Sequence, residues 1–245
     1  MIKLRKEDNI YILYLENKPV NALSMEFVHE LLELINEISK DDNLRGLILT
    51  STLKHFSAGA DLKERSLMSK EESINAVYLI KSLIVKILNF PSPTLSLING
   101  ACLGGGLELA CSSDFRLCSK DAIFAFPETS LGIIPGAGGT QLLPRIIGIT
   151  NAKKMIFSGK KIDSSTALAY GLVSARIENN KLLDSGLEEM KELTANSSFA
   201  TKIAKRSINE GYNLDISSAL NVEFREYIKT LDSKDRLNAL KKYKK

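Results

Sequence analysis

Two glutamates in the middle of the chain lie among residue types that favour acid–base chemistry. Glu108 follows the glycine run Gly104–Gly106, and Glu128 ends the apolar segment Phe124–Glu128. A carboxyl group in apolar surroundings has a raised pKa, so it can exchange a proton near neutral pH. If both carboxyls converge on one bound water, their repulsion favours a single shared proton, which general acid–base catalysis requires. The residues alone leave a structural alternative open, with glycines that mark tight packing and Glu128 on a surface loop.

The glycines before Glu108 predict a site that polarises a carbonyl group. Gly104–Gly106 is expected to begin a helix, where the first N–H groups have no intrahelical partner and glycine allows close approach. Glu108 follows Gly105 by about one helical turn and shares its face. A second donor is usually needed, and the Ala60 N–H in the small-residue turn Ser57–Asp61 is the candidate. The two loops together would form an oxyanion hole.

Other catalytic motifs are not met. Gly136–Gln141 is glycine-rich but lacks the Lys-Ser/Thr of a phosphate loop, and the chain has no G-x-S-x-G serine motif. His29 is expected on a solvated helix face and His55 in a structural role beside the oxyanion turn. No metal-ligand spacing is present, so we expect no metal site. The cysteines are expected to be free, small core residues, namely Cys102, Cys111 and Cys118.

Composition indicates an ordinary globular protein. The chain has 245 residues, 44% hydrophobic and 25% charged, with a formal net charge of +4. That charge is small for a dedicated nucleic-acid binder, and no apolar run approaches the roughly 20 residues of a membrane helix. The first residues are typical of a hairpin rather than a signal peptide. We therefore expect a cytoplasmic location, with a processed organellar form as the alternative.

The first hundred residues predict strands and helices that alternate. Ser24 is expected to cap an amphipathic helix that ends near residues 40–42, and a charged, mobile segment is expected at Lys63–Glu72 before a helix that Pro91 stops. The unit of strand, glycine turn and helix recurs after about 45–50 residues, which predicts a repeated unit in an α/β fold. The expected strands are Ile2–Leu4, Ile10–Leu15, Gly46–Thr50 and Thr94–Ile98.

The remainder of the chain predicts more short strands and then only helices. The expected strands are Phe115–Cys118, Ile123–Phe126 and Leu172–Ala175. The expected helices are Gln141–Ile147, Ala152–Phe157, one capped by Ile162–Ser164, Leu182–Leu193, Phe199–Ile208, Ile216–Leu231 and Asp235–Tyr243. A composition shift at Leu193–Ser198 predicts a core of residues 1–193 and a helical C-terminal region of residues 194–245.

Three motifs together resemble the enoyl-CoA hydratase/isomerase, or crotonase, family. They are SAGADLKER at Ser57–Arg65, NGACLGGGLELACSSDFRL at Asn99–Leu117 and PETSLGIIPGAGGTQLLPR at Pro127–Arg145. The resemblance implies a spiral of β-β-α units with a C-terminal helical region, assembled as trimers or pairs of trimers. It also implies stabilisation of the enolate of an acyl-CoA thioester, with the thioester as substrate and no further cofactor.

The same resemblance implies roles for individual residues. Glu108 would activate the water that adds at the β carbon, and Glu128 would handle the α-carbon proton. The amides of Ala60 and Gly105 would form the oxyanion hole, and the Gly136 amide would help to hold the water. The CoA moiety would contact Ala22, Ala58, Ala60, Asp61, Leu62, Lys63 and Gly105.

Both carboxylates together predict a hydratase acting on a short or branched 2-enoyl-CoA, because isomerases of the family generally keep only the equivalent of Glu128. An enoyl-CoA isomerase is the alternative. DLKERSLMS, IIPGAGGTQLLPR and SKDRLNAL resemble the methylglutaconyl-CoA hydratase branch, in which some members bind RNA through a lysine-rich first helix. Met25–Lys40 is glutamate-rich here, and Lys202–Arg206 and Lys241–Lys245 are interpreted as solvated helix faces, so nucleic-acid binding is not expected. Phe126 is the residue expected to influence acyl-chain specificity.

Overall fold

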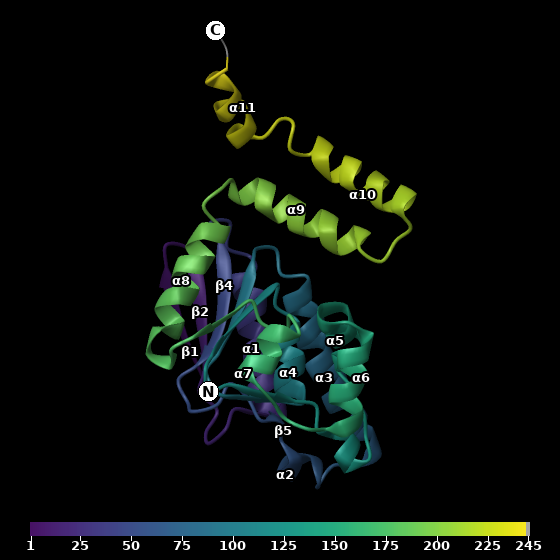
Figure 1. The fold of residues 1–245 in the computed structure, drawn as a ribbon. Coiled ribbons are helices and arrows are strands. Elements are labelled where there is room, and N and C mark those ends of the chain that lie inside the picture. The colour runs from purple at the N-terminus through teal and green to yellow at the C-terminus, as the bar shows by residue number, and fades with distance from the viewer. Residues whose placement is uncertain (244–245) are drawn as a thin grey trace.

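A six-stranded sheet is the centre of the computed structural model, which describes residues 1–243 (Figure 1). Its strand order is β1-β2-β4-β6-β8-β11; β1 is antiparallel to β2, and the other neighbours are parallel. The strands are β1 (Ile2–Glu7), β2 (Ile10–Leu15), β4 (Gly46–Ser51), β6 (Thr94–Ile98), β8 (Phe115–Ser119) and β11 (Ala175–Ile177). Burial on both faces suits the apolar runs of the central strands.

Short strands in two smaller sheets follow the strands of the large sheet. The pair β3-β5 and the three-stranded sheet β10-β9-β7 contain β3 (Ala22–Leu23), β5 (Gly59–Ala60), β7 (Ala101–Leu103), β9 (Ile123–Ala125) and β10 (Ile162–Asp163). The chain therefore runs four times from a large-sheet strand to a short strand and on to a helical segment. In the large sheet, Ile48 of β4 pairs with Leu95 of β6. The predicted repeat and the spiral of β-β-α units are confirmed.

Helices cover the sheets in the core. They are α1 (Met25–Ile38), α2 (Leu62–Arg65), α3 (Lys70–Leu88), α4 (Gly105–Cys111), α5 (Gly139–Ile147), α6 (Ile149–Ser158) and α7 (Ser164–Ala169), with 3-10 turns η1 (Glu128–Leu131) and η2 (Asn179–Lys181). The Ser24 hydroxyl caps α1 as predicted, accepting the Phe27 N–H at 3.3 Å. Ser69 and Glu72 form a capping box, so α3 begins within the segment that was predicted to be charged and mobile.

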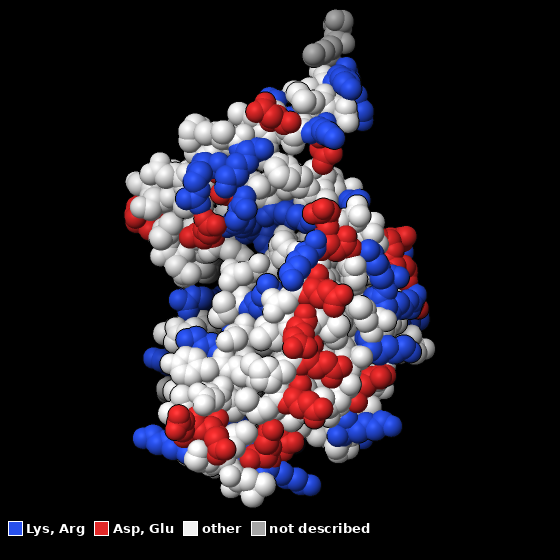
Figure 2. All heavy atoms as spheres, turned by 180° about the vertical axis from the view of Figure 1, so that it is seen from behind, with Lys and Arg blue, Asp and Glu red and all other residues white. Residues whose placement is uncertain are grey.

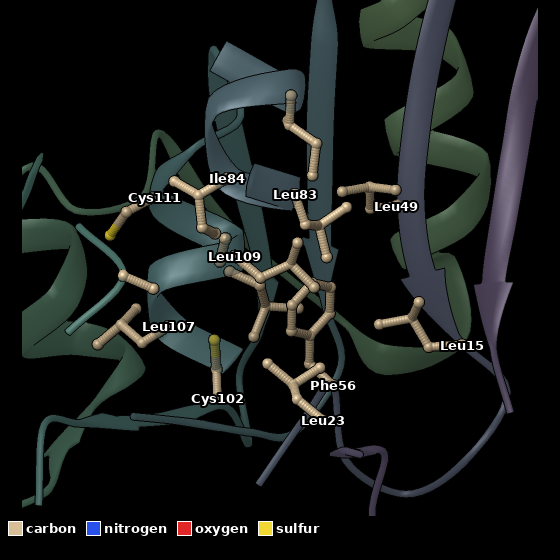
Figure 3. Packing of buried hydrophobic residues seen from close by; sticks show 14 of the residues in the cluster. Leu15, Leu23, Leu49, Phe56, Leu83, Ile84, Cys102, Leu107, Leu109 and Cys111 are labelled. Atoms are coloured by element: carbon tan, nitrogen blue, oxygen red, sulfur yellow. The ribbon is translucent and has the colours of Figure 1, made fainter. Parts of the chain in front are cut away.

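The core encloses α4 completely, because every residue of this helix is buried. Figure 3 shows Leu107, Leu109 and Cys111 of α4 among side chains of the same cluster that include Leu83 and Ile84 of α3. The prediction of free, buried cysteines is confirmed for all three thiols. A charged side chain on such a helix needs compensating hydrogen bonds, and Glu108 is the one that α4 carries.

One predicted strand is wrong. The sequence favoured a strand at Leu172–Ala175, but β11 is Ala175–Ile177 and pairs with β8. Leu172 and Val173 lie in the turn after α7 and are buried in the core. Their apolar side chains therefore reflect packing of a turn rather than a strand.

Four C-terminal helices follow the last strand. They are α8 (Leu182–Leu193), α9 (Ser198–Gly211), α10 (Ile216–Ile228) and α11 (Lys234–Lys241). α8 packs on the sheet, whereas α9 and α10 run side by side beyond the core and α11 projects further (Figure 1). The Lys205 ammonium ties α9 to the core through Asp114 at 2.6 Å. The division into a core of residues 1–193 and a helical region of residues 194–245 stays a prediction. None of the described helices is long and apolar enough to cross a membrane.

The distribution of surface charge is relevant to nucleic-acid binding, which the sequence did not lead us to expect. Viewed from behind, a column of acidic side chains runs down the middle of the molecule (Figure 2), and Glu26, Glu33 and Glu37 of α1 are exposed. In the Lys202–Arg206 segment, Lys205 and Arg206 form ion pairs within the chain. Residues 244 and 245 of the predicted basic C-terminus lie outside the described residues.

Candidate active site

A cavity of about 660 Å³ contains both glutamates that the sequence singled out. Its volume is within the range of small-molecule sites. The described residues that line it come from β5, α2, α3, α4, η1 and the loop after η1, and they are Ala60, Leu62, Arg65, Ser73, Val77, Ile80, Gly105, Glu108, Glu128, Gly132, Ile133, Ile134, Gly136 and Ala137. Five residues predicted to act on the thioester or on water therefore meet in one cavity.

The two predicted oxyanion donors lie next to each other. β5 approaches the start of α4 so closely that a Cβ on Gly59 would lie 3.1 Å from the Gly105 nitrogen, and a Cβ on Gly105 would lie 3.6 Å from the Ala60 nitrogen. Gly105 is the first residue of α4, so its N–H has no intrahelical partner. Gly59 has a φ of +90°, a conformation that glycine adopts readily. The arrangement can offer two amides to one oxygen.

Glu108 is held by a loop that the sequence analysis did not connect to it. Its Oε1 accepts the N–H groups of Ala137 at 2.9 Å and Gly139 at 2.8 Å. The residue is only 3% exposed, and this burial raises the pKa of the carboxyl while the loop amides lower it. The composition of the glycine run at residues 136–139 had suggested a comparison with phosphate loops. In the structure its amides bind a carboxylate of the same chain.

Glu128 is also buried, but the amides of the Gly136–Gly139 loop bind Glu108 and not this carboxyl group. Burial raises its pKa to about 7, and the nearby Glu108 contributes in the same direction. Within the described residues, Oε2 of Glu128 is buried without a hydrogen-bond partner. Its Oε1 lies against Gly104, since a Cβ there would be 2.8 Å from this oxygen. The raised pKa that the sequence predicted is confirmed, and Glu128 can carry a proton at neutral pH while Glu108 accepts hydrogen bonds.

Only some of the residues expected to contact CoA line the cavity. Leu62 lines the cavity together with Ala60 and Gly105. Asp61 caps α2, and its Oδ1 accepts the N–H groups of the second and third residues after it at 3.0 and 3.1 Å. The others, Ala22, Ala58 and Lys63, do not line the cavity. Their contacts with CoA stay a prediction, as does the hold of the Gly136 amide on a water.

Phe126, which was expected to influence acyl-chain specificity, is not part of the cavity wall. This ring is fully buried and does not line the cavity; a Cβ on Gly139 would lie 2.8 Å from its Cε1. Phe126 therefore supports the loop that holds Glu108. The apolar walls come instead from Val77 and Ile80 of α3 and from two isoleucines after η1, at positions 133 and 134. Of these wall residues, Val77 and the two isoleucines are exposed in the single chain, and exposed large apolar residues were the sequence signal for the walls.

His55 has the structural role that was expected, because its Nδ1 accepts the Ala101 N–H at 3.3 Å. His29 is exposed on α1, also as expected. Neither side chain lines the cavity. Among the residues described, the titratable groups in the cavity are therefore Glu108, Glu128 and Arg65.

Comparison with known proteins agrees with this geometry. The family model described as enoyl-CoA hydratase/isomerase matches residues 5–245. The chain is 40% identical over 229 residues to the mouse (Mus musculus) methylglutaconyl-CoA hydratase, covering 91% of this chain and 73% of that protein. Two crystal structures of enoyl-CoA hydratases are also similar. The one from Bacillus anthracis has a TM-score of 0.95 and 35% identity over 99% of this chain and 95% of that one.

The second, from Thermoplasma volcanium, has a TM-score of 0.91 and 28% identity over 100% of this chain and 97% of that one. The fold similarity thus persists where most side chains differ. Because the family model and the relatives match nearly the whole chain, the protein belongs to the enoyl-CoA hydratase/isomerase family.

Proposed function

We propose that the protein is an enoyl-CoA hydratase that adds water reversibly to a short or branched 2-enoyl-CoA, with the thioester as substrate and no resident cofactor. The observation that carries the proposal is the convergence of Glu108 and Glu128 on the cavity that Ala60 and Gly105 also line. An enoyl-CoA isomerase needs to move one proton between two carbons, whereas hydration needs a second group for the water. The names of the similar hydratases support the same choice.

The proposed reaction uses each group once. The thioester oxygen accepts hydrogen bonds from the amides of Ala60 and Gly105, which stabilise negative charge as it develops. Glu108, oriented by the loop, takes a proton from a water whose oxygen bonds to the β carbon on the same face of the double bond as the new α-carbon hydrogen. The electrons of that double bond move toward the thioester oxygen, and Glu128 then donates its proton to the α carbon. The pair begins with one proton and ends with one, because Glu108 gains what Glu128 loses.

An assay with two substrates tests the proposal. Purified protein is expected to hydrate crotonyl-CoA, with the product identified by mass spectrometry as the 3-hydroxyacyl-CoA. In parallel, a 3-enoyl-CoA is offered and its conversion to the 2-enoyl-CoA is followed. Conversion of the 3-enoyl-CoA without any hydration of crotonyl-CoA would make the protein an isomerase.

The pH profile of kcat/KM is expected to be bell-shaped. The active form holds one proton on the pair, and the pKa of Glu128 is about 7. As the pH rises above about 7, this proton is lost and the rate falls; at low pH Glu108 becomes protonated and no longer accepts the proton of water. The measurement is kcat/KM for crotonyl-CoA from about pH 5 to about pH 9. A rate that is constant from about pH 6 to about pH 9 would contradict the assignment of the proton to Glu128.

We also propose that the protein is a homo-oligomer, a trimer or a pair of trimers. The C-terminal helices expose many large apolar side chains, and such clusters mark interaction surfaces. On α9, α10 and the turn between them the exposed large apolar residues are Phe199, Ile208, Tyr212, Leu214, Ile216, Leu220, Phe224, Tyr227 and Ile228.

Light scattering during size-exclusion chromatography checks the assembly. The wild-type protein is expected to elute as a trimer or hexamer, and Phe224→Glu is expected to shift the population to smaller species, since this side chain is 65% exposed in the single chain. Leu4→Glu, which changes an exposed leucine of β1, serves as the control. A monomeric wild type at micromolar concentration would rule the proposal out.

A further inference from the structure

A fully buried asparagine is hydrogen-bonded to the segment that leads into β5. Asn21 comes directly before β3 and does not line the cavity. Burial of a side-chain amide costs free energy unless its hydrogen bonds are satisfied, so its partners show what it stabilises. Several of these partners lie between β4 and β5, and β5 is the strand that carries the Ala60 amide.

The side-chain amide of Asn21 connects two turns. Its Nδ2 hydrogens are shared among the Ser51 hydroxyl at 2.7 Å and the carbonyl oxygens of His55 and Phe56 at 3.0 and 3.1 Å. Its Oδ1 accepts the Asn17 N–H at 2.8 Å. The φ of Asn21 is +52°, which asparagine adopts more readily than most residues. The amide therefore holds the turn before β3 against the end of β4 and the turn that follows it.

The backbone of Asn21 extends this connection through Ser57. The Asn21 carbonyl oxygen accepts the Ser57 hydroxyl at 2.7 Å, and the oxygen of that hydroxyl accepts the Gly59 N–H at 3.2 Å. Ser57 is fully buried, and Gly106 of α4 packs against it. The hydrogen bonds that begin at Asn21 thus reach the residue next to Ala60, on the side of β5 that faces α4.

β5 is too short to fix its own position. It has two residues and pairs in parallel with the two residues of β3, where Leu23 is opposite Ala60. So short a ladder contains few hydrogen bonds. A misplacement of about 1 Å in a catalytic group can lower a rate about 100-fold, so the distance between the Ala60 and Gly105 amides has to be set by further contacts.

We infer that Asn21 is a positioning residue of the oxyanion hole, which acts through Ser57 on the Ala60 amide. Loss of its hydrogen bonds lets this amide move away from the oxygen that the Gly105 amide also contacts. The inference rests on the proposed thioester chemistry, but not on the choice between hydratase and isomerase, because both reactions develop negative charge on the same oxygen.

The kinetic test is Asn21→Gly, which removes the amide and keeps a residue that adopts a positive φ readily. With crotonyl-CoA, kcat is expected to fall by about 10- to 100-fold, because a displaced amide stabilises the developing charge poorly. KM is expected to change little, since the effect is on the transition state. Ser92→Ala is the matched control. It removes another fully buried hydrogen bond, to the Leu44 carbonyl oxygen at 3.2 Å, and is expected to lower the Tm but not kcat.

A bound chromophore separates positioning from a loss of stability. 4-Dimethylaminocinnamoyl-CoA absorbs at longer wavelength when its carbonyl group is polarised, so its absorption band reports on the oxyanion hole independently of turnover. Wild type and Ser92→Ala are expected to shift the band of the bound thioester by equal amounts, and Asn21→Gly by less. An equal shift in Asn21→Gly would overturn the inference, and so would a wild type that binds the thioester without any shift.

Ser57→Ala decides the question if Asn21→Gly does not fold. It removes only the hydroxyl between the Asn21 carbonyl oxygen and the Gly59 N–H. Its kcat is expected to fall by about 2- to 10-fold, the equivalent of one neutral hydrogen bond, together with a smaller band shift. Unchanged values would contradict the route through Ser57. A wild type that shifts the band without hydrating crotonyl-CoA would end the hydratase proposal alone, and the band shifts would still test Asn21.

Discussion

Glu128→Gln and Glu108→Gln are each expected to slow crotonyl-CoA hydration by about 100- to 10,000-fold, the range for one lost acid–base group. Gln at position 108 can still accept the Ala137 and Gly139 N–H groups through its carbonyl oxygen, so the loop stays in place. Gln at position 128 has the same shape but no proton to give. The loss in each variant therefore reports on proton transfer and not on a collapsed site.

Steady-state kinetics with purified variants checks this, with Glu178→Gln as the control because that exposed glutamate is paired with Lys120 and neither residue lines the cavity. Full activity in either Glu108→Gln or Glu128→Gln would refute the proposed roles.

The stability of Glu128→Gln gives an independent measurement. The pKa of Glu128 is raised by folding from 4.5 to about 7, so its ionisation opposes the folded state as the pH rises through this window. The Tm of Glu128→Gln relative to wild type is thus expected to increase between about pH 5 and about pH 8.

Gly106→Ala is expected to lower kcat by about 100- to 1,000-fold, comparable to the loss of an oxyanion donor. A Cβ at this position would lie 2.6 Å from the Ser57 Cβ and 2.7 Å from the Ser57 carbonyl oxygen. Because that oxygen belongs to the backbone, α4 must move away from the segment that leads into β5. The Ala60 and Gly105 amides would then separate, and one oxygen could no longer accept from both.

The measurement is kcat together with the Tm, since the same clash lowers stability. Gly171→Ala is the matched control: it places a Cβ on a glycine with a φ of +75° and nothing within 4 Å, so it adds backbone strain without displacing α4. A folded Gly106→Ala with wild-type kcat would show that the close approach of the two segments is not needed for catalysis.

The sequence was sufficient where the determining interactions are local. The helix start at Gly105, the cap at Ser24 and the buried strands Gly46–Ser51 and Thr94–Ile98 each depend on neighbours within one turn or one strand. A place where another group must come close to the backbone is also visible locally, because glycines are needed there. The Gly104–Gly106 run predicted a site for this reason.

Contacts between distant segments could not be predicted in the same way. The amides that hold Glu108 come from residues 29 and 31 positions later, and nothing local to the Gly136–Gly139 run says that its partner is a carboxylate. The surroundings of the Phe126 ring could not be predicted for the same reason. Phe126 is two residues from Glu128 in the sequence, yet its ring lies next to Gly139. Arg65 was part of a motif, but its place in the cavity depends on how α2 meets α3.

The β-β-α spiral has a consequence for how the proposed chemistry is divided along the chain. Three consecutive units of the spiral contribute to the site. The first contains β5 and supplies the Ala60 amide, the second supplies Gly105 and Glu108 on α4, and the third supplies Glu128 on η1. Activation of the thioester and delivery of the α-carbon proton are therefore separate modules, each encoded by its own stretch of sequence. A change confined to the third module could redirect the reaction to a new product, while the first two would go on binding and activating the same class of thioester.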